Sequence, residues 1–320
     1  MLRTRFEELN GPAWSELDKL LEQLERGRFV EAERVVSLYR RVCQHLALVR
    51  HRHLGADLEE RLNGLALRAH QQLYRREVPW RSALGYLAAG FPRDVRRQWR
   101  AVLAASLLFW GPFLLMLGLV QVRPDLAYAV LGTEQLAAVE QMYDPASPDR
   151  WRVRGADSDV LMFGHYVRNN VGIALQTFGG GVLFGLGSVF FLVFNGLVIG
   201  TVAGHLTRIG YGETFWPFVS GHSAFELSAI VLAGAAGLRL GGALLAPGQR
   251  SRARALREEA LDSAGLIWGF AVLLVLAAAV EAFWSPRLSV PAEVKYAVGL
   301  SLWGLFLGYL LLGGRGRAAR

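Results

Sequence analysis

The sequence predicts an all-α membrane protein, a polytopic transmembrane helical bundle preceded by an N-terminal soluble helical domain. Of the 320 residues, 52% are hydrophobic and only 19% are charged, which leaves too little polar surface for an ordinary soluble protein. Several long segments carry no charged residue, whereas the stretch before them is amphipathic. The apolar side chains of the later segments must therefore lie in lipid.

The N-terminal domain is expected to comprise residues 1–95 and to lie in the cytoplasm. Apolar residues recur there at helical spacing in three runs, which predicts three amphipathic helices. Pro12 suits the start of the first helix, and Gly27 and Gly55 fall in the breaks between the runs. No cleavable signal peptide is expected, because the first residues lead into a charged stretch rather than an apolar one.

The transmembrane domain is expected to comprise residues 96–315. An apolar core of ~30 Å is crossed by about 20 helical residues at ~1.5 Å each. Gly179, Gly180 and Gly181 mark a point where the chain could reverse between two passages. About six passages are predicted: 102–122, 160–180, 182–206, 219–245, 266–283 and 294–312.

The arginines decide the orientation of these passages, because cytoplasmic loops carry an excess of basic residues. Six passages place the arginine-rich loop around residues 250–257, the N-terminal domain and the arginine-rich tail on the cytoplasmic side together. The loop of residues 123–159, where acidic residues outnumber arginines, then lies outside. The localisation predicted is the bacterial inner membrane with both termini cytoplasmic; a re-entrant hairpin over residues 160–206 is the alternative.

Glycines recur at four-residue intervals within these segments. In lipid, close backbone approach at small residues supplies the contact between helices. We expect these glycines to pack helices within one chain, with a homo-oligomer face as the alternative; they are Gly181, Gly185, Gly196, Gly200, Gly204, Gly237 and Gly241.

Polar side chains inside apolar helices are costly, so each is a candidate site residue. Glu226 is the strongest candidate, with His222 one turn before it on the same helix face. The pair could bind a metal, relay a proton, or fix helix register by hydrogen bonds to Asn170, Asn195 or His205. Other candidates in the same polar set are Arg168, Asn169, Asn170, Asn195 and Glu281.

The sequence lacks the common signatures of an enzyme. There is no phosphate-binding loop of the GxxxxGK[ST] kind, no HExxH and no GxSxG, and Cys43 is the single cysteine. The net charge of +8 is almost wholly arginine, a bias that a GC-rich genome explains as well as a functional demand does. We therefore assign no catalytic residue, no metal ligand, no cofactor and no nucleic-acid partner from the sequence.

Several stretches in the same order resemble the stage II sporulation protein M family of bacterial integral membrane proteins. They are Arg168-Asn169-Asn170 before the glycine-rich run, Asn195-Gly196 with Gly200, the stretch from Gly221 and His222 through Glu226 to Leu238, and Glu281-Ala-Phe283. The resemblance implies a membrane anchor within a cell-envelope complex, whose partners could include a MoxR-type AAA ATPase system.

Three functions follow as hypotheses. The first is a non-enzymatic inner-membrane scaffold or anchor subunit whose partners are the lipid bilayer and other envelope proteins. The second is a transporter or channel with Glu226 on an ion or proton path. The third is an intramembrane metalloenzyme built on His222 and Glu226.

Overall fold

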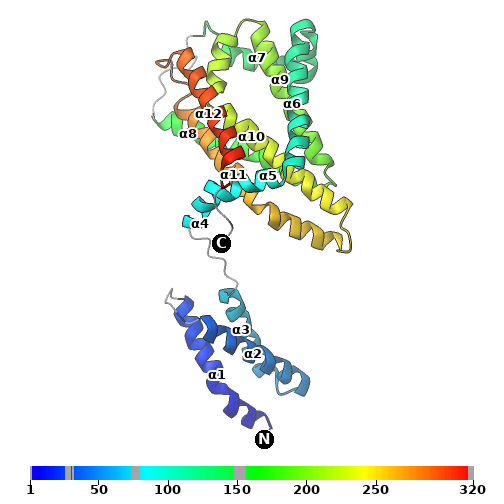
Figure 1. Cartoon of the computed structure of the whole chain (residues 1–320), viewed down its shortest axis with the longest axis vertical. Helices are drawn as coiled ribbons and strands as arrows, with labels where there is room; N and C mark the ends of the chain where they lie inside the picture. Colours follow the sequence, from blue (N-terminus) through cyan, green and yellow to red (C-terminus); the bar gives the residue numbers. More distant parts are fainter. Residues whose placement is uncertain (1, 26–29, 31, 74–79, 148–155, 316–320) are drawn as a thin grey trace. The chain divides into compact units, whose positions relative to one another are not determined.

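The computed structural model describes residues 2–25, 30, 32–73, 80–147 and 156–315, and every regular element in this part of the chain is helical. The all-α prediction is therefore confirmed. The chain divides into two compact units, Met1–Pro79 and Trp80–Arg320, which we call the N-terminal unit and the membrane unit (Figure 1). Gly27 and several arginines of the predicted loops and tail lie outside the described residues: Arg150, Arg152, Arg154, Arg317 and Arg320.

The N-terminal unit is a bundle of three amphipathic helices, α1 (Leu2–Glu25), α2 (Ala32–Arg52) and α3 (Ala56–Leu73). Each helix buries its apolar stripe against the other two, as residues at i, i+3 and i+4 on one face require. Charged side chains cover the outside in ion pairs such as Arg68 with Asp18. The shared core comprises Trp14, Leu17, Leu21, Val35, Leu38, Val42, Leu46, Val49, Leu58, Leu62, Leu65 and Ala69.

The position expected for Pro12 is wrong, because α1 begins at Leu2 and Pro12 lies inside it. The turns before the proline are held by aromatic packing. The ring of Phe6 lies 6.0 Å from that of Trp14 and 5.6 Å from that of His45. These tertiary contacts offset the hydrogen bond that a proline removes from a helix.

The membrane unit begins with a short helical elbow made of α4 (Trp80–Gly85), the π-helix η1 (Tyr86–Gly90) and α5 (Phe91–Arg97). The elbow is tied to the end of the last helix of the chain. Arg96 donates to the carbonyl of Gly313 at 2.7 Å and also to that of Leu310. The guanidinium therefore satisfies carbonyl groups that a helix C-terminus leaves unpaired.

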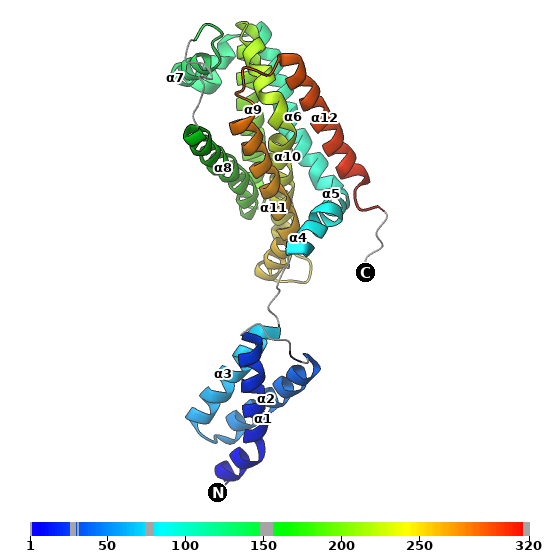
Figure 2. The same ribbon diagram turned by 90° about the vertical axis from the view of Figure 1, so that its left-hand side faces the viewer.

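Five of the described helices are long and apolar enough to cross a membrane: α6 (Trp99–Val122), α9 (Leu186–Arg208), α10 (Gly212–Leu245), α11 (Arg252–Phe283) and α12 (Ala292–Leu312). Two more connect α6 to α9 (Figure 2): α7 (Asp125–Tyr143), which is kinked at Gly132, and α8 (Ala156–Gly179). Helix α8 is not one of the five apolar helices, because it contains polar residues such as Arg168, Asn169 and Asn170. The six-passage topology remains a prediction.

The directions of these helices follow from their contacts. Gly196 and Gly200 of α9 face Phe109 and Phe113 of α6 in the same order, so α6 and α9 run parallel. Because they run parallel, the chain must return through the bundle between the end of α6 and the start of α9. Helix α8 makes that return, since it begins beside Phe283 at the end of α11 and ends beside the start of α9.

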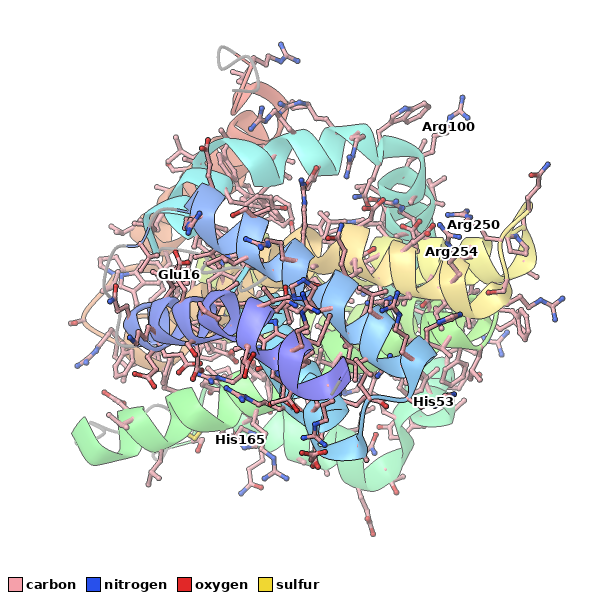
Figure 3. The ribbon with its side chains drawn as sticks, turned by 90° about the horizontal axis from the view of Figure 1, so that it is seen from below. Glu16, His53, Arg100, His165, Arg250 and Arg254 are labelled. Atoms are coloured by element: carbon pink, nitrogen blue, oxygen red, sulfur yellow. The ribbon has the colours of Figure 1, made fainter. Side chains whose placement is uncertain are left out.

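The two ends of the membrane unit therefore differ in charge. The starts of α6 and α11 and the ends of α10 and α12 share one end, which we call the arginine end. Figure 3 views the molecule from below, and the labelled Arg100, Arg250 and Arg254 lie on the same side of the picture. The opposite end, which carries α7, is called the α7 end.

The repeated glycines lie between helices of the same chain. The backbone of Gly181 touches that of Gly237, Gly185 touches Gly241, and Gly204 lies against Leu117 of α6. At Gly185 the backbone also adopts φ +85°, a conformation that favours glycine. These contacts allow the chain to reverse through η2 (Gly180–Val182) between α8 and α9.

Candidate functional site

A cavity of about 600 Å³ lies in the half of the membrane unit nearer the α7 end. Residues of α6, α9, α10 and α12 line it, and Figure 1 shows α12 on the left, α6 and α9 on the right and α10 between them. Most of its wall is aromatic or aliphatic, which suits the apolar body of a ligand. The aromatic residues of the wall are Trp110, Phe113, Tyr143, Phe215, Trp216, Phe218, Tyr296 and Trp303.

Three titratable side chains meet at this cavity: His222 and Glu226 of α10 and Glu281 of α11. One ligand atom from each lies within 4.8 Å of the other two. His222 Nε2 lies 3.6 Å from Glu226 Oε2, which exceeds the length of a hydrogen bond. The imidazole nitrogen and the carboxylates therefore lie close together, and contacts among them do not use up their hydrogen-bonding capacity.

The other side of the imidazole is held in place. His222 Nδ1 lies 3.2 Å from Ser285 Oγ, and Lys295 Nζ donates to the carbonyl oxygen of Ser285 at 2.7 Å. His222 is only 4% exposed, and its ring packs edge to face against Phe218 at 5.5 Å. A hydrogen bond from Nδ1 to Ser285 leaves the Nε2 lone pair directed toward the two carboxylates.

Asn170 completes the cluster from the side of α8. It lies beside Glu281 and is only 4% exposed. Its side-chain oxygen accepts a hydrogen bond from Asn169 at 3.1 Å, while its amide nitrogen has no partner among the described residues. One oxygen of Glu281, Oε2, is also buried and unpaired there. Buried polar atoms are usually satisfied in proteins, and Asn170 lies within hydrogen-bonding reach of Glu281.

Electrostatics restricts what this cluster can hold. Two carboxylates within 4.8 Å of each other in an apolar bundle repel strongly unless a cation or a proton lies between them. No arginine or lysine forms an ion pair with Glu226 or Glu281 among the described residues, and Lys295 instead donates to a backbone carbonyl. The arrangement is chemically suited to binding a cation.

The other predicted site residues lie elsewhere. Asn195 donates to Phe191 of its own helix at 2.7 Å, and His205 pairs with Glu140 of α7 at 2.7 Å, so neither contacts Glu226. Arg168 and Asn169 are exposed on α8. Of the polar set proposed from sequence, the structure brings together His222, Glu226, Glu281 and Asn170.

Two residues of the cluster, Lys295 and Ser285, were not among the site residues predicted from the sequence. Lys295 is one of only two lysines in the chain and stands at the start of an apolar helix, which is a usable signal. Ser285 follows the end of α11 in a turn and carries no such signal. Its role depends on the fold bringing that turn against His222.

Comparison with known proteins bears on both units. The model of the family described as Stage II sporulation protein M matches residues 101–286, which is more than half of the chain. A model described as a domain of unknown function, DUF8413, matches residues 4–75. No curated protein and no solved structure matches the chain.

The first match comprises α6 through α11 and includes Asn170, His222, Glu226 and Glu281, whereas Lys295 and α12 lie beyond it. The second match falls entirely within the N-terminal unit. The family model over residues 101–286 therefore identifies the family of the chain. This chain is a membrane protein of the stage II sporulation protein M family.

Proposed function

We propose that this protein is a cation transporter of the bacterial cytoplasmic membrane, with Glu226 and Glu281 forming its cation site. The observation that carries the proposal is that two carboxylates and an imidazole line one cavity inside a bundle of apolar helices. Ionisable groups within a membrane are expensive to bury and typically mark an ion or proton path. No arginine or lysine forms an ion pair with either carboxylate among the described residues, so the cluster lacks the positive charge that a purely structural arrangement would need.

The cavity ends before it reaches the arginine end. Below Glu226, α10 presents a continuous run of buried residues, from Ala229 to Gly237, that packs against the neighbouring helices. A transport cycle therefore requires this seam to open.

Replacing Glu226 with glutamine is expected to reduce cation flux at least tenfold, because the neutral side chain keeps the shape but loses the charge that attracts the cation. The measurement is uptake of protons and of Zn²⁺ into proteoliposomes, each followed with a trapped fluorescent indicator. Glu140→Gln is the matched control, since Glu140 pairs with His205 outside the cavity. Equal flux through the wild-type protein and Glu226→Gln would overturn the transport role.

Both termini are proposed to be cytoplasmic, because Arg100 near the start of α6 and Arg250 and Arg254 at the connection between α10 and α11 lie at the arginine end. A reporter enzyme that works only in the cytoplasm should then be active when it is inserted at Gly248, in the loop between α10 and α11. A reporter enzyme that works only in the periplasm should be active when it is inserted at Pro145, after α7. A periplasmic signal from the Gly248 insertion would refute the six-passage topology.

A second candidate function is that of a scaffold subunit in an envelope complex, with partners that could include a MoxR-type AAA ATPase. It is favoured by the N-terminal unit, which has its own core and matches a separate domain model. Affinity purification in mild detergent should then recover stable partner proteins, and deletion of residues 1–79 should release them. Recovery of the full-length chain alone at native abundance argues against this role.

A further inference from the structure

We propose that His222, Glu226 and Glu281 bind one divalent transition-metal ion, with an open coordination position facing the cavity. The proposal deepens the cation site proposed above and names the class of ion. A site of one imidazole nitrogen and two carboxylate oxygens suits Zn²⁺ or Mn²⁺ better than Ca²⁺ or Mg²⁺, which take oxygen ligands.

The geometry fits such an ion. In a tetrahedral zinc site with bonds of about 2.0–2.2 Å, neighbouring ligand atoms lie roughly 3.3–3.6 Å apart. His222 Nε2 and Glu226 Oε2 are already 3.6 Å apart, and all three ligand atoms lie within 4.8 Å. Bringing the Glu281 oxygen to the same distance from the other two ligand atoms requires a shift of about 1 Å. Glu281 Oε2 has no hydrogen-bond partner among the described residues, so no such bond opposes the shift.

The surroundings resemble those of a metal site. Metal-binding histidines usually donate their second ring nitrogen to an acceptor, which fixes the ring and its tautomer, and Ser285 Oγ is placed to accept from Nδ1 at 3.2 Å. Asn170 lies beside Glu281 with an unpaired amide nitrogen, so it can hold the second oxygen of a ligating carboxylate.

Charge balance also favours a divalent ion. Two ionised carboxylates and a dication sum to zero, and a neutral cluster is far less costly in an apolar bundle than two unpaired anions. A single proton shared by the carboxylates would leave the imidazole nitrogen without a role. Three protein ligands and a cavity of about 600 Å³ leave room for water or for an oxygen of a bound molecule at the fourth position.

The test uses the full-length protein, purified in detergent, stripped with a chelator and dialysed against Zn²⁺ or Mn²⁺. Metal content measured by mass spectrometry should approach about one ion per chain, as expected for a single site. His222→Ala and Glu281→Gln should each lose the ion. Ser285→Ala should keep the ligands but weaken binding about 10–100-fold.

The chain offers a matched control. His205 and Glu140 form another His–Glu pair, with Nε2 and Oε1 2.7 Å apart, outside the group of three ligands. His205→Ala should therefore bind as much metal as the wild-type protein. Thermal unfolding with and without Zn²⁺ separates lost binding from lost folding, because the metal should raise the Tm of the wild type and of His205→Ala but not that of His222→Ala or Glu281→Gln.

Each outcome distinguishes this proposal from the transport role. Failure of the stripped wild-type protein to bind Zn²⁺ and Mn²⁺ at micromolar concentrations would overturn the metal site, even if proton flux still depended on Glu226. Metal retained by both ligand variants would overturn it as well. Stoichiometric binding without flux would keep the metal site and reject the transporter.

Discussion

Replacement of Gly200 with leucine should remove most of the stability of the membrane unit. An added Cβ would lie 2.8 Å from Phe113 Cα and still closer to the Phe113 carbonyl oxygen. These are backbone atoms, so the clash cannot be relieved by a side-chain rotation. The only relief is separation of α6 from α9, and we expect a loss of at least about 3 kcal/mol, the upper end of the usual cost of overpacking.

Gly118→Leu provides the control for this substitution. Gly118 lies on the partner helix α6, and a Cβ there would meet nothing within 4 Å. Thermal unfolding in nanodiscs should show a sharply lower Tm, or no monodisperse protein, for Gly200→Leu. Gly118→Leu should match the wild type. Equal Tm values for the two variants would mean that the seam between α6 and α9 is not as tight as described.

Loss of Arg239 should have the second largest effect. Its guanidinium forms an ion pair with Glu259 of α11, and the two side chains are only 23% and 19% exposed. Arg239→Leu leaves the Glu259 carboxylate unpaired in a mostly apolar setting, and we expect a cost of about 2–3 kcal/mol. Adding Glu259→Leu removes that unpaired charge and should restore most of the lost stability.

The pair formed by Arg254 and Glu258 is the comparison. Its nitrogen and oxygen are 2.8 Å apart, but the side chains are 72% and 42% exposed. Removal of Arg254 should therefore cost less than about 0.5 kcal/mol. Unfolding by sodium dodecyl sulfate in mixed micelles measures these three variants against the wild type. A double variant at residues 239 and 259 that is no more stable than Arg239→Leu would contradict the unpaired-charge explanation.

The local features of the fold could be predicted from sequence. The three helices of the N-terminal unit, the glycine reversal near residue 180 and the shared face of His222 and Glu226 all depend on spacing along one segment. Pro12 was misplaced because the contact that overrides it, between Phe6 and His45, joins different helices.

The composition of the site could be predicted only in part, for the same reason. Glu281 was a candidate in the polar set, but only the antiparallel pairing of α11 with α10 brings it to His222 and Glu226. The same pairing joins Arg239 to Glu259. Neither neighbour can be inferred from a helical period.

The parallel arrangement of α6 and α9 has a consequence for biogenesis. Their seam joins Phe109 to Gly196, so α7 and α8 are synthesised between its two halves. Helix α6 must therefore leave the translocon with its partner face uncovered and wait in the lipid until α9 arrives. During that interval the face that later receives the glycines is open to insertase chaperones and quality-control proteases. This close contact of the mature bundle is thus completed only after α7 and α8 have been synthesised.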